Sequence, residues 1–173
     1  MNRALANKRF VIVGGTTGLG LAAAKAFVGE GARVVVVGRN AESVAKAESA
    51  LGKAACGLAG DATNPQTTVE AINLAKRELD GFDGLYHVAG GSGRSMGDGP
   101  LHEIGDDGWR QTIDLNLTSV FNSNRAALRE LTALDQGGER YWVGKMKACQ
   151  SLMLVFALIA VSGSAEDLSL IHI

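Results

Sequence analysis

The glycine-rich run Gly14-Gly15-Thr16-Thr17-Gly18-Leu19-Gly20 is the part of this sequence best suited to bind an anion. A short apolar stretch precedes the run and a helical apolar pattern follows it, so we predict a loop between a strand and a helix. At such a junction, free backbone N–H groups and the positive end of the helix dipole attract phosphate. Glycine permits a tight turn at Gly14, close approach of a phosphate at Gly18 and helix–strand packing at Gly20. The run therefore predicts a pyrophosphate site whose contacts are Gly14, Thr16, Thr17, Gly18, Leu19 and Gly20.

A second glycine pattern overlaps the first. Residues 18–23 match G-x-G-x-x-A, but this pattern would leave four loop residues between the strand and its first glycine. The wider spacing, G-x-x-x-G-x-G, begins where the strand ends, so we prefer it. The alternative interpretation is a tight turn in an α/β protein that binds no nucleotide.

Arg39 stands 19 residues after Gly20, where dinucleotide-binding folds bring a side chain to the adenosine ribose. An acid at this point would bind the ribose 2′-hydroxyl of NAD(H). Gly38-Arg39 has no carboxylate to repel a 2′-phosphate, and its guanidinium can pair with one. The pair favours NADP(H), while NAD(H) stays an open alternative; Arg39 could also be a solvated arginine that begins a loop.

These residues need a scaffold of strands and helices, and the apolar pattern predicts one. Strands are expected at residues 9–13, 33–37, 54–59 and 84–88, with helices between them. The run of valines at 34–37 does not alternate with polar residues, which is typical of a parallel strand covered on both faces. We predict an α/β fold of the Rossmann type: a doubly wound parallel sheet with helices on both faces, ending after the fourth strand and a long following helix.

Local signals set the expected helix ends. Asn40 is expected to cap a helix that ends at Gly52, and Asn64-Pro65 to begin the next. Asp106 or Asp107 is expected to cap the long helix, which runs past Trp109 and Leu131 and ends before Gly137. The glycine-rich segment at 90–100 is predicted to be a loop over the site. The helix after Asn64 is expected to bury Val69, Ile72, Ala75, Lys76 and Leu79.

Composition excludes several classes of protein. With 173 residues, 46% hydrophobic and 20% charged, the chain is expected to form one globular domain. The 17 basic and 18 acidic residues are interspersed, so we predict no nucleic-acid partner and no membrane surface partner. The apolar run at 152–161 is shorter than the roughly 20 residues of a membrane span. Cys56 and Cys149 lack metal-ligand spacing, so we expect reduced thiols, no metal site and a cytoplasmic protein.

Residues 8 to about 136 resemble the short-chain dehydrogenase/reductase family, because four of its motifs occur in order. They are the glycine loop, Asp61-Ala62 after the third strand, His87-Val88-Ala89-Gly90 after the fourth, and Asp114-Leu115-Asn116-Leu117 in the long helix. The resemblance implies that Asp61 and Ala62 lie near the adenine ring, and that Ala89 and Gly90 are further cofactor neighbours. The chain departs from the family at Val13, where a threonine is common, and at His87-Val88, where two asparagines are usual.

Two polar residues of these motifs have expected roles. The resemblance implies that Asn116 kinks its helix and supports a proton relay through water, so we predict it as a catalytic residue. An asparagine flanked by two leucines is costly to bury without such a partner. His87 ends a buried strand and is interpreted as a hydrogen-bonded structural residue, with a catalytic base as the alternative.

The resemblance stops near Gly138. The family places a serine after the next strand and then Tyr-x-x-x-Lys, whereas Tyr141 and Lys145 have this spacing with no strand or serine before them. We interpret the pair as coincidental and divide the chain into an incomplete NAD(P)-binding Rossmann domain, 1–138, and an unrelated tail, 139–173. Residues 168–173 can be encoded by CTGTCTCTTATACACATC, which resembles a sequencing-adapter end. The hypothesis for the tail is a frameshift near Gly138 followed by read-through into adapter sequence.

Three functions follow as hypotheses. The first is an oxidoreductase that transfers hydride between NADP(H) and an alcohol or ketone, a homo-oligomer in its parent form and inactive as the chain given, which lacks a convincing Ser and Tyr-x-x-x-Lys set. The second is a non-catalytic dinucleotide-binding module. The third is a fragment with no function of its own, because an incomplete sheet leaves an open edge.

Overall fold

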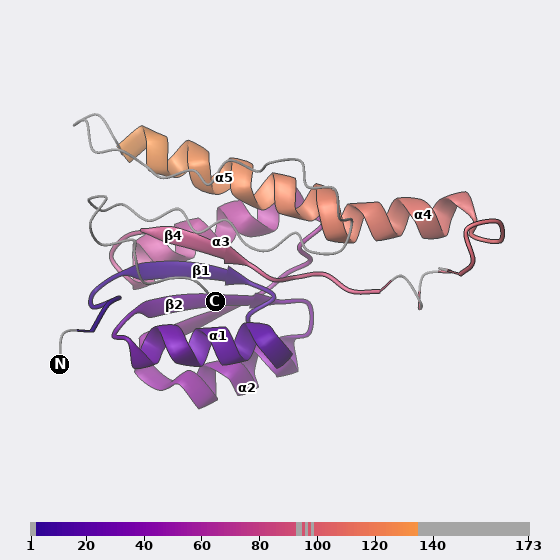
Figure 1. The fold of residues 1–173 in the computed structure, drawn as a ribbon. Helices are drawn as coiled ribbons and strands as arrows, with labels where there is room; N and C mark the ends of the chain where they lie inside the picture. Colours follow the sequence, from indigo (N-terminus) through magenta and orange to yellow (C-terminus); the bar gives the residue numbers. More distant parts are fainter. Residues whose placement is uncertain (1–2, 93–94, 96, 98, 135–173) are drawn as a thin grey trace.

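A four-stranded parallel sheet forms the centre of the molecule (Figure 1). The computed structural model of the chain describes residues 3–92, 95, 97 and 99–134. The strands are β1 (Arg9–Val13), β2 (Arg33–Gly38), β3 (Ala55–Ala59) and β4 (Gly84–His87), in the spatial order β3-β2-β1-β4. Every pair is parallel, and Val13 lies opposite Val37 on one side and His87 on the other. The predicted parallel sheet is confirmed.

Helices cover both faces of the sheet, as predicted (Figure 1). Helices α1 (Gly18–Gly29) and α2 (Ala41–Leu51) lie on one face; a single 3₁₀ turn (Gly52–Ala54) links α2 to β3. On the other face lie α3 (Pro65–Glu78) and α5 (Ser119–Leu134). Helix α5 continues a rod that begins with α4 (Asp106–Ile113) and the π-helical segment η3 (Asp114–Thr118), and α4 extends past the carboxyl ends of the strands (Figure 1).

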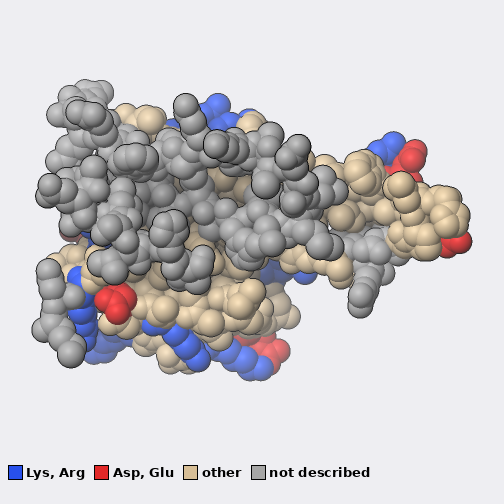
Figure 2. Space-filling view, in the orientation of Figure 1, with Lys and Arg blue, Asp and Glu red and all other residues tan. Residues whose placement is uncertain are grey.

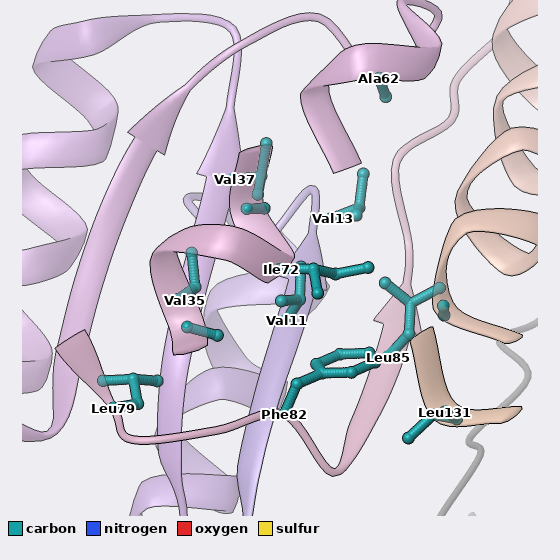
Figure 3. Close-up of a cluster of buried hydrophobic side chains, with 13 residues drawn as sticks. Val11, Val13, Val35, Val37, Ala62, Ile72, Leu79, Phe82, Leu85 and Leu131 are labelled. Atoms are coloured by element: carbon teal, nitrogen blue, oxygen red, sulfur yellow. The ribbon is translucent and has the colours of Figure 1, made fainter. Parts of the chain in front are cut away.

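The core has two halves, because alternate residues of each strand point to opposite faces. Val11, Val13, Val35 and Val37 pack with residues of α3 and α5, including Ile72 and Leu131 (Figure 3). On the other face, Phe10, Ile12, Val34 and Val36 pack with α1 and α2, and the rings of Phe10 and Phe27 meet edge to face at 4.9 Å. The sheet is thus covered on both sides, which explains the unbroken apolar runs of β1 and β2.

An arginine–aspartate pair ties the start of β1 to the segment before β4. Asp83 is buried and accepts hydrogen bonds from the backbone N–H of Arg9 at 2.8 Å and from its guanidinium at 2.6 and 3.1 Å. The bond to Asp83 also raises the pKa of Arg9. The pair fixes the amino ends of β1 and β4, whereas the glycine loop lies at the carboxyl ends of the strands.

Asparagine caps begin two of the helices as predicted. The side-chain oxygen of Asn40 accepts the N–H of Ser43 at 2.9 Å, and that of Asn64 accepts the N–H of Gln66 at 2.9 Å. Pro65 occupies the first turn of α3, where its fixed φ suits the helix and its missing N–H costs nothing. Helix α2 ends at Leu51, and Gly52 follows with a positive φ.

Two expectations for the helices were wrong. Neither Asp106 nor Asp107 caps α4, because Gly105 takes the capping position and both acids fall in the first turn. In α3, Val69 and Lys76 are exposed, and Thr67, Thr68 and Ala71 are buried in addition to the predicted Ile72, Ala75 and Leu79. The long helix is interrupted where the resemblance implies a kink at Asn116, because residues 114–118 widen into a π-helical turn.

The outer side of the rod leaves apolar side chains uncovered by the rest of the described chain. Trp109, Leu117 and Phe121 are each about half exposed, and the Arg125 guanidinium lies over the Phe121 ring, 4.7 Å from its centroid. The hollow beside them, about 680 Å³, is lined by η3 and α5. On the face shown in Figure 2, basic and acidic side chains both lie along the edge formed by α1 and α2, as their interspersed sequence predicts.

Candidate nucleotide-binding site

A cleft of about 430 Å³ lies beyond the carboxyl ends of the strands. In doubly wound sheets ligands bind at this edge, where the chain crosses from one side of the first strand to the other. Here that point lies between β1 and β4. Every residue predicted to contact the dinucleotide lines the cleft: Gly14, Thr16, Thr17, Gly18, Leu19, Gly20, Arg39, Asp61, Ala62, Ala89 and Gly90.

The glycine loop packs so tightly that side chains at two of its positions would collide with backbone. Gly14 has a φ of 88°, and a Cβ there would lie 2.6 Å from the Ala89 nitrogen. A Cβ on Gly20 would overlap the Gly14 carbonyl oxygen and lie 2.9 Å from a methyl of Val88. Gly18 also has a positive φ, 49°, but a Cβ at this position would meet no atom within 4 Å. Gly14 and Gly20 therefore allow the loop to close on β4, and Gly18 leaves open space for a ligand.

The amino end of α1 has no side-chain cap. Thr17 holds the capping position but its side chain makes no capping hydrogen bond, and the first turn contains no acidic residue. Helices α2 and α3 differ, because Asn40 and Asn64 cap them. The first N–H groups of α1 and the positive end of its dipole are thus left for an external acceptor, and this end of the helix lines the cleft.

The far end of the cleft is formed by the residues that follow β2. Arg39 is exposed, and Asn40 and Ser43 stand beside it in the wall. Gly38 lies directly against buried Thr16, because a Cβ on Gly38 would overlap the Thr16 hydroxyl oxygen. A side chain at position 38 would therefore require the buried Thr16 side chain to move.

Asp61 adds a carboxylate to the same end of the cleft. The N–H and hydroxyl of Thr63 both donate to its Oδ1 at 2.8 Å, so its Oδ2 takes neither bond. The Thr63 N–H is the main cause that lowers the pKa of this carboxyl; partial burial opposes it, and the Thr63 hydroxyl and the charge of Arg39 add to it. Asp61 is therefore ionised at neutral pH and lies close enough to Arg39 to feel its charge.

Asn116 reaches the site through the backbone of Gly91. Its Oδ1 accepts the Gly91 N–H at 3.0 Å, and its Nδ2 donates to the carbonyls of Gly91 and Thr112, both at 2.9 Å. These bonds satisfy the half-buried amide, whose neighbour Leu115 lines the cleft. Asn116 lies in the π-helical segment, a distortion often found at functional sites. Its predicted part in a proton relay stays a prediction.

His87 is buried behind the cleft, with 1% of its surface exposed. Its Nε2 lies 3.0 Å from the Ala89 carbonyl oxygen, and its Nδ1 lies 2.7 Å from the Ser123 hydroxyl of α5. Burial lowers its pKa, and the bond to Ala89 opposes that shift only in part. These contacts agree with the interpretation of His87 as a hydrogen-bonded structural residue.

Several residues of the cleft were not selected from the sequence. Asn40, Ser43, Gly60, Val88 and Leu115 also line it. Each is adjacent or close in sequence to a predicted contact, so their positions after strand ends or beside Asn116 could have indicated them. Tyr141, Lys145 and Cys149 lie outside the described residues.

A metal site and a membrane span each place requirements on the described residues. Among the described residues, no group of three or more His, Cys, Asp or Glu is placed to hold a metal ion. None of the helices that the structure describes is long and apolar enough to cross a membrane. Cys56 is a free thiol in β3, and burial is the main cause that raises its pKa.

The strand order and the glycine loop between β1 and α1 define the class of protein as a Rossmann-type α/β fold. Residues 8–139 match the family described as short chain dehydrogenase, and the chain belongs to that family. The match confirms the resemblance and its extent.

Relatives of this chain include named dehydrogenases. Serine 3-dehydrogenase of Agrobacterium fabrum is 32% identical over 112 residues, which cover 65% of this chain and 44% of that protein. A "probable NADP-dependent dehydrogenase" of Haemophilus influenzae is 29% identical over 127 residues, 73% of this chain and 49% of that protein. A crystal structure titled as a short-chain dehydrogenase/reductase, glucose/ribitol dehydrogenase, from Brucella melitensis has a TM-score of 0.65 at 26% identity, covering 75% of this chain and 54% of that one. The chain thus spans about half the length of these relatives.

Proposed function

We propose that the described residues bind NADP(H) for hydride transfer to or from an alcohol or ketone. The open amino end of α1 is the observation that carries the proposal, because it presents unbonded N–H groups to the cleft while the neighbouring helices are capped. The pyrophosphate would accept from these groups, next to Gly18, where no side chain blocks its approach.

Gly38 and Arg39 support a preference for NADP(H). An acid that binds a ribose 2′-hydroxyl at position 38 would displace Thr16, since even a Cβ there overlaps its hydroxyl oxygen. The Arg39 guanidinium is exposed in the cleft wall and can pair with a 2′-phosphate in two parallel hydrogen bonds. The H. influenzae relative, named as NADP-dependent, agrees with this choice.

The other residues of the cleft suggest where the adenine and nicotinamide ends of the cofactor would lie. Asp61 is ionised, and its Oδ2 can accept a hydrogen bond from the exocyclic amine of adenine, with Ala62 beside the ring. Ala89 and Gly90 line the end near β4. Asn116 would hold Gly91 in place there and so support a proton relay through water, as the family resemblance implies.

The bound nicotinamide would supply or accept the hydride, and the chain's residues orient it. Two relatives are named serine 3-dehydrogenase and gluconate 5-dehydrogenase, and these names suggest a hydroxyl-bearing small molecule as substrate. We propose an alcohol or its ketone as the substrate class.

A non-catalytic dinucleotide-binding module is the second candidate. Arg39 and Asp61 are the charged residues that line the cleft in the described part of the chain, and both lie at its adenosine end. The described residues therefore place no ionisable side chain at the nicotinamide end to act as acid or base.

One experiment separates the two candidates. The purified chain is incubated with NADPH and a panel of small ketones, and with NADP⁺ and the corresponding alcohols, while the absorbance of the reduced nicotinamide is followed. Turnover that disappears in a Gly14→Ala control supports the oxidoreductase. Binding of NADPH without turnover of any substrate would agree with the expected inactivity of this chain and would favour the binding module as the function of the chain as given.

A further inference from the structure

His87 lies where the end of β4 meets α5. It is the last residue of β4, paired with Val13 of β1, and it precedes Val88 and Ala89, which line the cleft. Its ring contacts Ser123 and Ser119, which face it from α5 at 2.7 and 3.4 Å. A buried imidazole with several polar partners, directly behind a ligand cleft, calls for a role beyond filling space.

The partners of the ring define its proton positions. The Ala89 carbonyl oxygen can only accept, so Nε2 must carry the proton that is shared with it. Burial lowers the pKa of the ring and so favours the neutral form. In that form Nδ1 accepts from the Ser123 hydroxyl at 2.7 Å, a shorter distance than the 3.0 Å from this hydroxyl to its other acceptor, the Val120 carbonyl oxygen. The ring is therefore expected to be the neutral tautomer protonated on Nε2.

The Ala89 carbonyl depends on this ring for its hydrogen bond. The strand β4 ends at His87, two residues earlier, and β4 is the edge of the sheet in the described part of the chain. No neighbouring described strand is therefore placed to donate to Ala89. The Ala89 N–H, in contrast, bonds to the Val13 carbonyl at 3.0 Å.

The backbone held by His87 is the surface on which the glycine loop rests. A Cβ on Gly14 would lie 2.6 Å from the Ala89 nitrogen and 2.8 Å from its Cα. A Cβ on Gly20 would lie 2.9 Å from a Val88 methyl. Gly14 and Gly20 thus lie directly against this backbone with no side chain between them, so a shift of Ala89 toward the loop would press on Gly14.

We propose that His87 is a positioning residue for the glycine loop: by holding the Ala89 carbonyl through Nε2–H, it fixes the backbone against which Gly14 and Gly20 pack. The effect on cofactor affinity rests on the proposed function; the effect on the loop does not. The Ala89 carbonyl sets the tautomer, and Ser123 links the ring to α5.

The test compares three variants of the full chain. His87→Leu removes both bonds, His87→Gln keeps an amide that can donate to Ala89, and Ser123→Ala removes only the link to α5. We expect His87→Leu to weaken NADPH binding about tenfold, the effect of roughly one hydrogen bond, and the other two to stay within about threefold of wild type. Leu131→Ala, a buried residue of α5 away from the cleft, controls for general destabilisation.

A spectroscopic measurement keeps the proposal testable without cofactor. In ¹H–¹⁵N spectra of the free chain, His87→Leu should displace the amide signals of Gly14 and Gly20, and Leu131→Ala should leave them in place. The ¹⁵N shifts of the wild-type imidazole should show a proton on Nε2 only, a result that needs no variant to fold.

The outcomes are distinct. A proton on Nδ1, unmoved glycine signals in His87→Leu, or an equal loss of affinity in His87→Leu and Leu131→Ala would each overturn the positioning role. If the wild-type chain fails to bind NADPH but the glycine signals move as expected, the proposed function fails and the role of His87 in the loop stands.

Discussion

Gly38 and Arg39 are the residues on which the expected choice between NADP(H) and NAD(H) depends. Position 38 has no room for an acid while Thr16 keeps its place, and Arg39 puts a positive charge in the same wall of the cleft. We therefore expect both residues to favour NADP(H), Gly38 by excluding a carboxylate and Arg39 by pairing with a 2′-phosphate.

Replacing Arg39 with aspartate should reverse this preference. Loss of the pairing cation and repulsion of the 2′-phosphate should weaken NADPH by about tenfold to a hundredfold, the range of a charge-assisted hydrogen bond, with little loss for NADH. Fluorescence titration with both nucleotides measures the ratio. Arg77→Asp, on the exposed side of α3, is the matched charge control. An unchanged ratio of affinities would show that Arg39 does not contact the 2′-phosphate.

Gly14 is the residue whose replacement should show how closely the loop packs. Gly14 and Gly52 both have positive φ, but a Cβ meets the Ala89 backbone at Gly14 and open space at Gly52. Gly52→Ala should therefore cost about 1–2 kcal/mol of unfolding free energy from backbone strain alone. Gly14→Ala should cost at least about 1 kcal/mol more because it overpacks the loop, and it should abolish NADPH binding. Chemical denaturation of both variants measures the difference, and equal costs would contradict the packing seen at Gly14.

At the scale of elements, the helices that follow β1, β2 and β3 begin in different ways. Asparagine side chains close the amino ends of α2 and α3, whereas the amino end of α1 is open and lies in the cleft. Stability alone would favour a cap at each helix, since a cap contributes about 1 kcal/mol. We propose that a bound ligand supplies the missing stability at the open end of α1.

Alanine variants of Thr17 and Asn64 should separate stability from binding. Asn64→Ala removes a capping bond and should lower the unfolding free energy by about 1 kcal/mol, with NADPH affinity unchanged. Thr17→Ala removes no capping bond, so stability should change by less than about 0.5 kcal/mol while NADPH affinity falls. Thermal unfolding with and without NADPH provides both quantities. A stability loss in Thr17→Ala as large as that in Asn64→Ala would contradict the open helix end.

The elements also show what sequence reasoning could reach. Asn40, Asn64 and Pro65 act within a few residues of themselves, so their signals predicted the starts of α2 and α3. The start of α4 was harder to predict, because Asp106 and Gly105 are both acceptable capping residues. The buried side of α3 was also harder to predict, because tertiary packing and not local sequence decides which face of a helix is buried.

The candidate site was predictable where motifs lie at strand ends and less so elsewhere. The loop at Gly14 and the residues after β2, β3 and β4 converge because parallel strands end at one edge. The hydrogen bonds of His87 join it to Ser119 and Ser123, which are 32 and 36 residues away. No local sequence pattern predicts such a contact. The resemblance implied a kink at Asn116, but its bonds to Gly91, 25 residues away, could not be read from the sequence.

At the scale of the whole molecule, buried His87 should make stability depend on pH. Its pKa in the folded chain is lowered from the ordinary 6.5, so the unfolded chain binds the proton more readily. Neutral His87 contributes its full share of stability at pH values above 6.5, the ordinary pKa of histidine. As the pH falls below 6.5 toward the lowered pKa of the folded chain, the free energy of unfolding decreases. Urea denaturation from about pH 7.5 to about pH 5 should show this loss, and His87→Gln should flatten it. An equal slope in both proteins would assign the pH dependence to other groups.

The whole described chain is a single layered unit whose two core halves meet at one sheet, with the cleft at the carboxyl edge of that sheet. We propose that this chain, which spans about half the length of its short-chain dehydrogenase relatives, binds NADP(H) by the open end of α1 and the glycine loop. Isothermal titration of the 173-residue chain with NADPH, and then with NADH, tests this claim most directly. We predict one saturable NADPH site, at least about tenfold tighter than NADH, the difference expected for one charge-assisted pair. No heat of binding with either nucleotide, together with no thermal stabilisation, would contradict it.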